Sequence, residues 1–94
     1  MKVLFTEEAA HDLEAAVSFV ALRNPEGAQR LAERVLRLTD QLAARGFEGV
    51  EQELTTGERV RSWPVPPFRI YQQRRAEALV VLRIYHQARQ PITR

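Results

Sequence analysis

Cysteine is absent from this chain of 94 residues, lysine occurs once, as Lys2, and apolar runs are short. Without cysteine the protein has no disulfide framework, no thiolate nucleophile and no thiolate metal site. A transmembrane helix needs about 20 consecutive apolar residues, which this sequence does not contain. The opening residues, Met1 to Glu8, turn acidic too early for a secretory signal. These absences indicate a cytoplasmic protein with no membrane partner.

Metal-binding and cofactor motifs are also missing. A structural zinc site needs four ligands that meet, whereas the two histidines, His11 and His86, fall in different predicted elements. His11 stands beside Asp12 on a predicted helix surface, where we expect a structural role. We therefore expect neither a metal ion nor another cofactor.

Arginine carries almost all of the positive charge, and its distribution is uneven. The formal net charge is only +2, and residues 1–45 are about neutral. From Arg59 onward a single acid, Glu77, stands against the arginines Arg59, Arg61, Arg69, Arg74, Arg75, Arg83, Arg89 and Arg94. A GC-rich genome explains the preference for arginine over lysine equally well, but it does not explain the clustering. The planar guanidinium suits carboxylates and phosphates, so we expect an anionic partner.

Two amphipathic helices are predicted in the first half, after a short strand candidate at residues 2–5. Thr6 caps the first helix, which ends near Arg23. Asn24 and Pro25 supply the cap and first residue of the second helix, which Gly46 ends. The link between the helices is so short that they must form an antiparallel hairpin. Their apolar residues recur at helical spacing, at Ala9, Leu13, Ala16, Val17 and Val20, and at Ala28, Leu31, Ala32, Val35, Leu38 and Leu42.

The second half predicts a loop followed by three strands. Residues 47–56 have no apolar period and read as the loop. Gly57 opens a strand through about Trp63, and the prolines at 64, 66 and 67 interrupt its ladder. Two more strands begin at Phe68 and near Ala78, joined by a polar turn at residues 74–78. The order β-α-α-β-β-β predicts a single α+β domain over residues 1–94, with the helical hairpin packed on one face of a small antiparallel sheet.

Alternation along the strands predicts which residues share a face. The set expected under the helices is apolar: Val60, Phe68, Ile70, Val80, Leu82 and Ile84. The set expected to point away mixes arginines with aromatic and aliphatic residues: Arg59, Arg61, Trp63, Arg69, Tyr71, Leu79, Val81, Arg83 and Tyr85. An exposed apolar patch rimmed with charge is typical of a partner site. The alternative is that the helices, the C-terminal tail or a second copy of the chain covers this face.

Five short motifs together resemble the RelE/ParE superfamily, whose members are toxins of type II toxin–antitoxin modules. The motifs are Asp12-Leu13, Asn24-Pro25, the segment 57–61, Pro67-Phe68-Arg69-Ile70-Tyr71, and the segment 81–89, which reads VLRIYHQAR. The ParE branch is the more similar in its helix start at Asn24-Pro25, its PFRIY strand and its terminal His86-Gln-Ala-Arg89. The resemblance spans essentially the whole chain.

This resemblance implies a growth-inhibiting toxin that binds DNA gyrase, without catalysis, and is neutralised by a cognate antitoxin. We expect the antitoxin to contribute an acidic, amphipathic segment and to form a hetero-oligomer with the toxin. The strand and tail from Arg83 to Arg94 are the expected main contact region. The residues predicted to bind partners are Arg59, Arg61, Trp63, Arg69, Tyr71, Arg83, Tyr85 and Arg89.

The RelE branch offers the alternative of a ribosome-dependent endoribonuclease that cuts messenger RNA. Such a reaction needs a general base, a cation near the scissile phosphate and a proton donor for the leaving oxygen. The candidate residues are Arg69, Arg89 and His86. Arginine remains protonated near neutral pH and is a poor base, which leaves His86 as the only histidine near the cationic strands. A third possibility is an inactive family member that binds nucleic acid.

Structural roles compete with each of these functional assignments. Arg83 has alternative partners in Glu58 and Glu77, and Trp63 has an alternative role in packing against the proline turn. Tyr71 and Tyr85 have an alternative structural role as large side chains that fill space on the sheet. A histidine at a strand end, such as His86, more often bonds to backbone than acts as a base.

Overall fold

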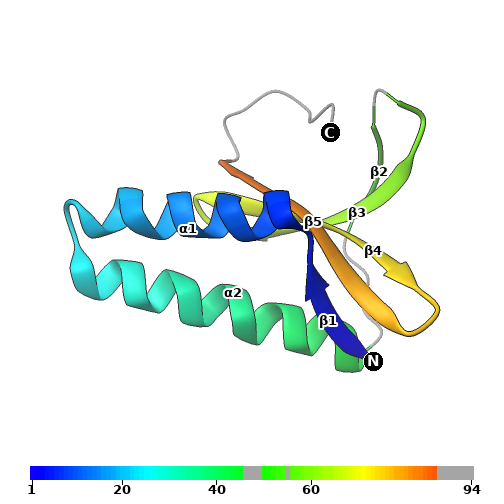
Figure 1. The fold of residues 1–94 in the computed structure, drawn as a ribbon, viewed down its shortest axis with the longest axis horizontal. Helices are drawn as coiled ribbons and strands as arrows, with labels where there is room; N and C mark the ends of the chain where they lie inside the picture. The colour runs from blue at the N-terminus through cyan, green and yellow to red at the C-terminus, as the bar shows by residue number, and fades with distance from the viewer. Residues whose placement is uncertain (46–49, 55, 87–94) are drawn as a thin grey trace.

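The computed structural model describes residues 1–45, 50–54 and 56–86. Two helices pack on a five-stranded sheet, so the fold is α+β (Figure 1). None of the described helices is long and apolar enough to cross a membrane. In chain order the elements are β1 (Lys2–Phe5), α1 (Glu7–Ala21), α2 (Pro25–Arg45), β2 (Val50–Glu53), β3 (Arg59–Val65), β4 (Phe68–Arg75) and β5 (Ala78–His86).

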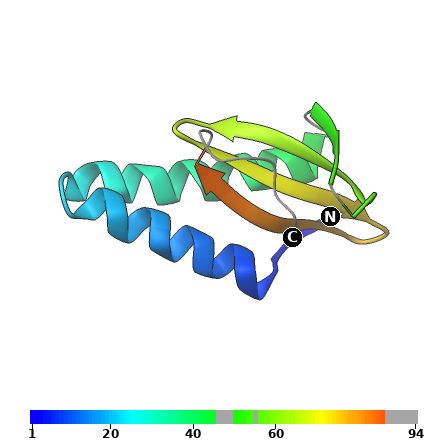
Figure 2. The same cartoon turned by 90° about the horizontal axis from the view of Figure 1, so that it is seen from above.

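The strands lie in the order β1-β5-β4-β3-β2. β1 runs parallel to β5, and every other neighbouring pair is antiparallel. The helices have their main strand contacts with β1 and β5, at one side of the sheet (Figure 2). β3 and β2 extend the sheet past them. The predicted fold class is confirmed, with β1 as a parallel edge strand and β2 as a strand that the sequence did not indicate.

Both predicted helix starts are confirmed. The side chain of Thr6 accepts a hydrogen bond from the amide of Ala9 at 3.0 Å, and that of Asn24 accepts one from the amide of Gly27 at 2.9 Å. Each side chain satisfies an amide that a helix leaves without a partner in its first turn. The second helix continues to Arg45, and Gly46, its predicted end, lies outside the described residues.

Residues 47–56 were predicted to form a loop, and this prediction is wrong for residues 50–53. Val50–Glu53 forms β2, which pairs with β3 from Ser62 to Arg59. This strand shows no alternation because all four of its residues are exposed at the sheet edge. Gly57 lies between β2 and β3 rather than at the start of a strand, and its φ of +88° is open to glycine but costly for other residues.

The sequence predicted that Pro64 would interrupt β3, and this prediction is wrong. The strand runs through Pro64, which lies opposite Arg69 of β4. β2 begins at Val50, opposite Ser62, so its described pairing with β3 does not reach Pro64. The prolines that end β3 are Pro66 and Pro67, which are joined by a cis peptide bond.

The short proline turn sets which face each β3 residue occupies. Val65 lies directly opposite Phe68, and Trp63 lies opposite Ile70, so these pairs share a face. Phe68 and Ile70 pack under the helices as predicted. Trp63 therefore faces the helices and Val60 faces away, and both predictions were wrong because alternation alone does not give the phase between two strands.

A β-bulge in β5 explains why the other face assignments on this strand were wrong. Tyr71 pairs with Arg83, but Gln72 pairs with Val81, so Leu82 is an extra residue at this step. The extra residue inverts the alternation on its two sides. Leu79 and Val81 consequently pack toward the helices, whereas they were predicted to point away. Val80 and Leu82 were predicted to lie under the helices but pack on the opposite face.

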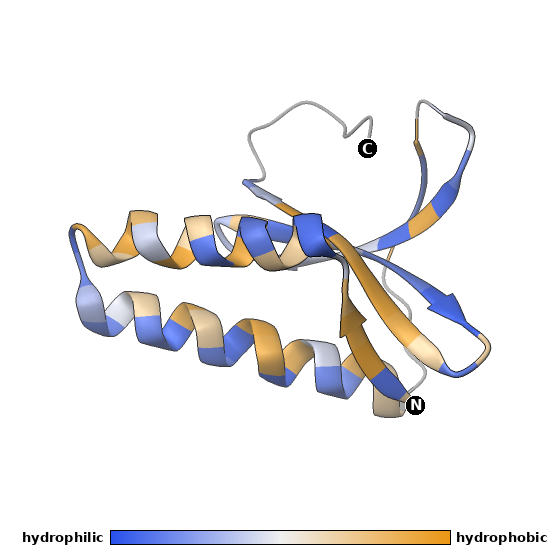
Figure 3. Ribbon diagram, in the orientation of Figure 1, coloured by the Kyte–Doolittle hydropathy of each residue, from blue (hydrophilic) through white to orange (hydrophobic). Residues whose placement is uncertain are grey.

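Apolar side chains are consequently buried on both faces of the sheet. The main cluster joins α1 and α2 to β3, β4 and β5, and Ile84 belongs to it as predicted. The hydropathy colouring follows this arrangement, with apolar β1 and β5 beside the helices (Figure 3). The second cluster contains Leu54, Val60, Ala78, Val80 and Leu82 and lies on the face away from the helices. The face away from the helices was predicted to be open. Its apolar part is buried instead, since Val60 and Leu82 are at most 2% exposed.

Candidate functional site

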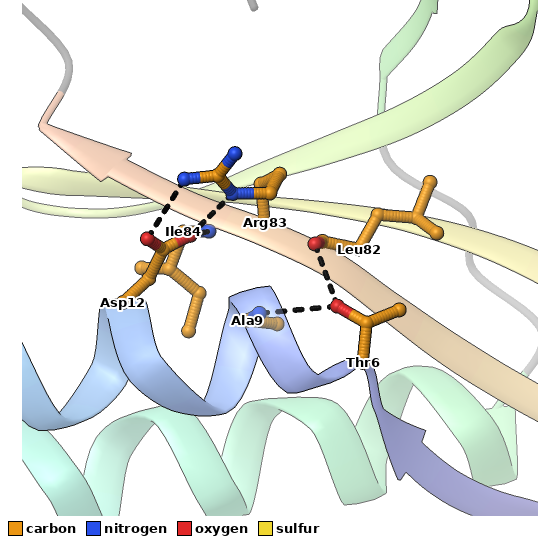
Figure 4. A network of polar contacts seen from close by, with 6 residues as sticks. All are labelled: Thr6, Ala9, Asp12, Leu82, Arg83 and Ile84. Carbon is orange, nitrogen blue, oxygen red and sulfur yellow. Dashed lines mark hydrogen bonds and ion pairs between the residues drawn. The ribbon is translucent and has the colours of Figure 1, made fainter. Parts of the chain in front are cut away.

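An ion pair ties the C-terminal half of β5 to α1. The carboxylate of Asp12 accepts hydrogen bonds from Arg83 Nε at 2.7 Å and Nη2 at 3.0 Å (Figure 4). It also accepts one from the backbone amide of Ile84 at 3.0 Å. The hydrogen bond to Asp12 raises the pKa of the Arg83 guanidinium above its ordinary value. Arg83 was predicted to pair with Glu58 or Glu77 or to meet a partner; its observed partner is Asp12.

The position of this ion pair follows from the length of β1. β1 ends at Phe5, opposite Val81, so the edge of β5 has no parallel neighbour beyond that point. Thr6 continues the contact with its amide, which donates to the Val81 carbonyl at 3.0 Å, and with its hydroxyl, which donates to the Leu82 carbonyl at 2.9 Å (Figure 4). Asp12, two turns into α1, then accepts from Ile84. Thr6, the N-cap of α1, and Asp12 within α1 thus replace the missing strand.

The predicted partner residues Arg69, Tyr71, Arg83 and Tyr85 do share one face, which we call the tyrosine face. The rings of Tyr71 and Tyr85 meet edge to face, with their centroids 6.3 Å apart. The Arg83 guanidinium lies over the Tyr85 ring at 4.5 Å from its centroid, a cation–π geometry. Arg69 donates from Nη1 to the hydroxyl of Ser62 at 2.8 Å. These residues are partly exposed, and Tyr71 and Tyr85 pack against the second apolar cluster.

Three other predicted partner residues lie on the opposite face of the sheet. Trp63 packs against the cluster that Leu42 and Ala43 of α2 form with Leu79. Arg59 and Arg61 both contact the carboxylate of Glu51 on β2, and the Arg61 distance is 3.4 Å. The prediction of one surface that includes Arg59, Arg61 and Trp63 together with the tyrosine face is therefore wrong. Arg89 lies outside the described residues.

His86 also lies on the helix side of the sheet. It pairs with Phe68 across the strands, and the two rings meet edge to face at 5.6 Å. An open hollow of about 490 Å³ separates this strand end from α1 and is lined by Phe19, Ala15, Phe68, Ile84 and His86 among others. Arg69 pairs with Tyr85 one position away, so its side chain points to the opposite face. The two nuclease candidates that the structure describes, Arg69 and His86, therefore project from opposite faces of the sheet.

The structure also reveals a concentration of arginines that the sequence analysis missed. Arg34 and Arg37 of α2 line a hollow beside Trp63 on β3. The sequence does contain a signal for this concentration of arginines. Arg30, Arg34 and Arg37 recur at intervals of four and three, which places them on one side of a helix. The C-terminal strands have the greater excess of arginine over acid and therefore the stronger signal. Among the described residues no group of histidines, aspartates and glutamates is arranged to hold a metal ion.

Comparison with known proteins assigns the family. A family model described as the ParE toxin of the type II toxin–antitoxin system parDE matches residues 3–91. No curated protein matches the chain. A solved structure described as the chromosomal ParDE toxin–antitoxin system from P. aeruginosa superposes with a TM-score of 0.74 at 23% sequence identity, over 92% of this chain and 95% of that one. That likeness independently supports the fold, and the family model covers nearly the whole length. The chain belongs to the ParE toxins of type II toxin–antitoxin systems.

Proposed function

We propose that this toxin inhibits DNA gyrase by protein–protein contact, and that a cognate antitoxin neutralises it in the cytoplasm. The observation that carries the proposal is the match to the ParE toxin family over residues 3–91. A toxin that acts by binding needs a shaped, partly exposed surface with aromatic and arginine side chains, because these residue types dominate binding energy at interfaces. It needs no general base.

The tyrosine face supplies the surface that we assign to gyrase. Arg69, Tyr71 and Tyr85 are partly exposed and are fixed by their neighbours: Arg69 by Ser62, and the tyrosines by each other. Side chains held in this way lose little conformational entropy when a partner binds. The contact region predicted from Arg83 to Arg94 overlaps this face at Arg83 and Tyr85, and its remaining part, residues 87–94, lies outside the described residues.

The ribonuclease alternative receives no support from a specific arrangement of the described residues. Arg69 and His86 project from opposite faces of the sheet, and Arg83 is bound to Asp12. A phosphate held at Arg69 would therefore lack a nearby histidine to remove the 2′-hydroxyl proton. The inactive, nucleic-acid-binding alternative likewise has no observation in its favour.

Two assays test the proposal. Expression of the chain alone should stop growth, and co-expression with the antitoxin encoded by the neighbouring reading frame should restore it. Purified protein should inhibit gyrase in a supercoiling assay and leave messenger RNA intact in a translation extract. Ribosome-dependent cleavage of messenger RNA, with no effect on supercoiling, would contradict the proposal.

A further inference from the structure

An apolar stripe on α1 remains exposed in the folded protein. Ala15, Phe19 and Leu22 recur at intervals of four and three, so they lie on one side of the helix. Phe19 is 62% exposed and Leu22 is 84% exposed, the largest exposed fractions among the large apolar side chains of the described residues. Scattered exposed apolar residues need no explanation, but a stripe of them on one helix is typical of a contact surface.

The stripe borders the apolar hollow between α1 and the end of β5. The volume of this hollow is about 490 Å³, and Ala15 and Phe19 line it from α1. Phe68 and Ile84 line it from the sheet. The hollow exists because β1 ends opposite Val81, so the last part of β5 has no neighbouring strand on this side. Stripe and hollow together form one apolar surface with room for the side chains of another molecule.

The two ends of α1 carry opposite charge. The first turn contains Glu7 and Glu8, and Arg23 follows the last turn. All three side chains are exposed. A second hollow, of about 410 Å³, lies at the acidic end and is lined by Glu7, Glu8, His11, Asp12 and Arg83. Because Asp12 is bound to Arg83, the two glutamates are the exposed carboxylates of this hollow.

This pattern makes α1 complementary to a second copy of itself in the reverse direction. A two-fold axis at Ala15, the small residue of the stripe, places each residue opposite the one equally far from Ala15 on the other side. Arg23 of one copy then lies over the acidic first turn of the other, where its long side chain can reach Glu8. Phe19 of one copy lies opposite His11 of the other, between the two hollows. Each copy therefore supplies what the other lacks.

We propose that α1 is a self-association surface, through which two copies of the chain pair antiparallel about a two-fold axis at Ala15. The methyl groups of the two Ala15 residues let the helices approach to roughly 8 Å. Phe19 of each copy packs into the apolar surface of the other. Arg23 of each copy pairs with Glu8 of the other, so the symmetry makes this contact twice.

The charges favour a second copy over other occupants of the stripe. A uniformly acidic partner would be repelled by Glu8 and a uniformly basic one by Arg23, whereas a reversed copy meets both with the opposite sign. The inference is independent of the proposed gyrase contact. Arg69 and Tyr71 point to the other side of the sheet, so both copies of the dimer keep them accessible.

Charge reversal tests the two-fold geometry. Sedimentation equilibrium of the purified full chain should show a monomer–dimer equilibrium. Arg23→Glu and Glu8→Arg should each weaken dimerisation at least about tenfold, because each turns two attractive contacts into two repulsive ones. An equimolar mixture of the two variants should dimerise within about twofold of the unchanged chain, since the mixed dimer has a base opposite an acid at both contacts. Arg75→Glu reverses an exposed arginine at the end of β4 and is the matched control, which should also stay within about twofold.

A second pair of variants tests the apolar stripe. Phe19→Glu should weaken dimerisation at least about tenfold, because it places a carboxylate in the apolar centre of the contact. Leu36→Glu is the matched control, since Leu36 is an exposed apolar residue of α2 that lies outside both hollows. It should stay within about twofold of the unchanged chain. If circular dichroism shows that Phe19→Glu is unfolded, Phe19→Gln replaces it, with Leu36→Gln as its control.

Several results would overturn the self-association surface. One is a chain that stays monomeric at all concentrations up to about 100 μM, which is weaker than a specific dimer of this kind should be. Others are a mixture of Arg23→Glu and Glu8→Arg that dimerises no better than either variant alone, and equal losses in Phe19→Glu and Leu36→Glu. A monomeric chain whose Phe19→Glu variant folds but no longer inhibits gyrase would instead assign the stripe to gyrase.

Discussion

Asp12 of α1 and Arg83 of β5 form a two-point ion pair 71 positions apart in the chain, and the same carboxylate accepts the Ile84 amide. This arrangement fixes the end of β5 against the first helix after β1 has ended. It also orients Arg83 over the Tyr85 ring, so that a residue of the helical hairpin positions the tyrosine face. Fold and proposed binding surface therefore depend on one carboxylate.

Asp12→Ala should lower the free energy of unfolding by about 2 kcal/mol, since it removes three hydrogen bonds and leaves a largely buried guanidinium without its carboxylate. Urea denaturation followed by circular dichroism measures this value. Glu14→Ala, an exposed acid on the same helix, is the matched control and should change the stability by less than about 0.5 kcal/mol. Equal effects of the two substitutions would show that the ion pair contributes no stability.

Thr6→Ala should cost about 1 to 2 kcal/mol, because the hydroxyl both caps α1 and donates to the Leu82 carbonyl at the bulge. Thr6→Ser keeps the hydroxyl and should recover most of that stability. The comparison uses thermal unfolding of the two variants side by side. If serine proved as destabilising as alanine, the threonine methyl group rather than its hydroxyl would be responsible.

The helical part of the fold was predictable because its signals are local. Thr6 and Asn24 mark helix starts through the amides that they cap, and the apolar spacing of α1 and α2 records the face that each buries. The strands Phe68–Arg75 and Ala78–His86 were found by the same local reasoning. The exposed strand β2 carried no such signal, since an edge strand without a buried face has no alternation.

The faces of the sheet were not predictable from alternation because they depend on relations between strands. One extra residue at Leu82 and a two-residue proline turn invert the assignments of Val80 and Trp63. The hypothesis of a single outward cationic face is therefore wrong, and Arg83 in particular is bound to Asp12. The family resemblance is confirmed. It depends on the order of residues along the chain, and a shift in strand register does not change that order.

Gly57→Ala should destabilise the protein by about 1 to 2 kcal/mol through the backbone alone, since the φ of +88° is unfavourable for a residue with a side chain. A Cβ atom at this position would meet no other atom within 4 Å, so steric overlap does not contribute. Gly57→Asn should cost less, because asparagine tolerates the left-handed region better than alanine. Chemical denaturation of the two variants provides the measurement, and an alanine variant as stable as the unchanged chain would refute the strain.

His86→Ala should leave toxicity within about twofold of the unchanged chain. The imidazole lies on the helix side of the sheet, packed at the edge of Phe68 and away from the tyrosine face. Growth inhibition across a range of induction levels measures the effect, with protein amounts checked by immunoblot. Loss of toxicity in a variant that still folds would instead support the ribonuclease alternative, in which His86 serves as the base.

Arg69→Gln should reduce gyrase inhibition by about tenfold, because the loss of a guanidinium at the centre of an interface removes a dominant contact. Glutamine retains an amide that can donate to Ser62, so the fully buried hydroxyl keeps a partner and the fold should persist. Arg75→Gln, an exposed arginine at the β4 end, is the matched control and should inhibit normally. The readout is the concentration that halves supercoiling. Because supercoiling involves no messenger RNA, a selective loss in Arg69→Gln would locate the gyrase contact on the tyrosine face, and equal inhibition by both variants would place it elsewhere on the toxin.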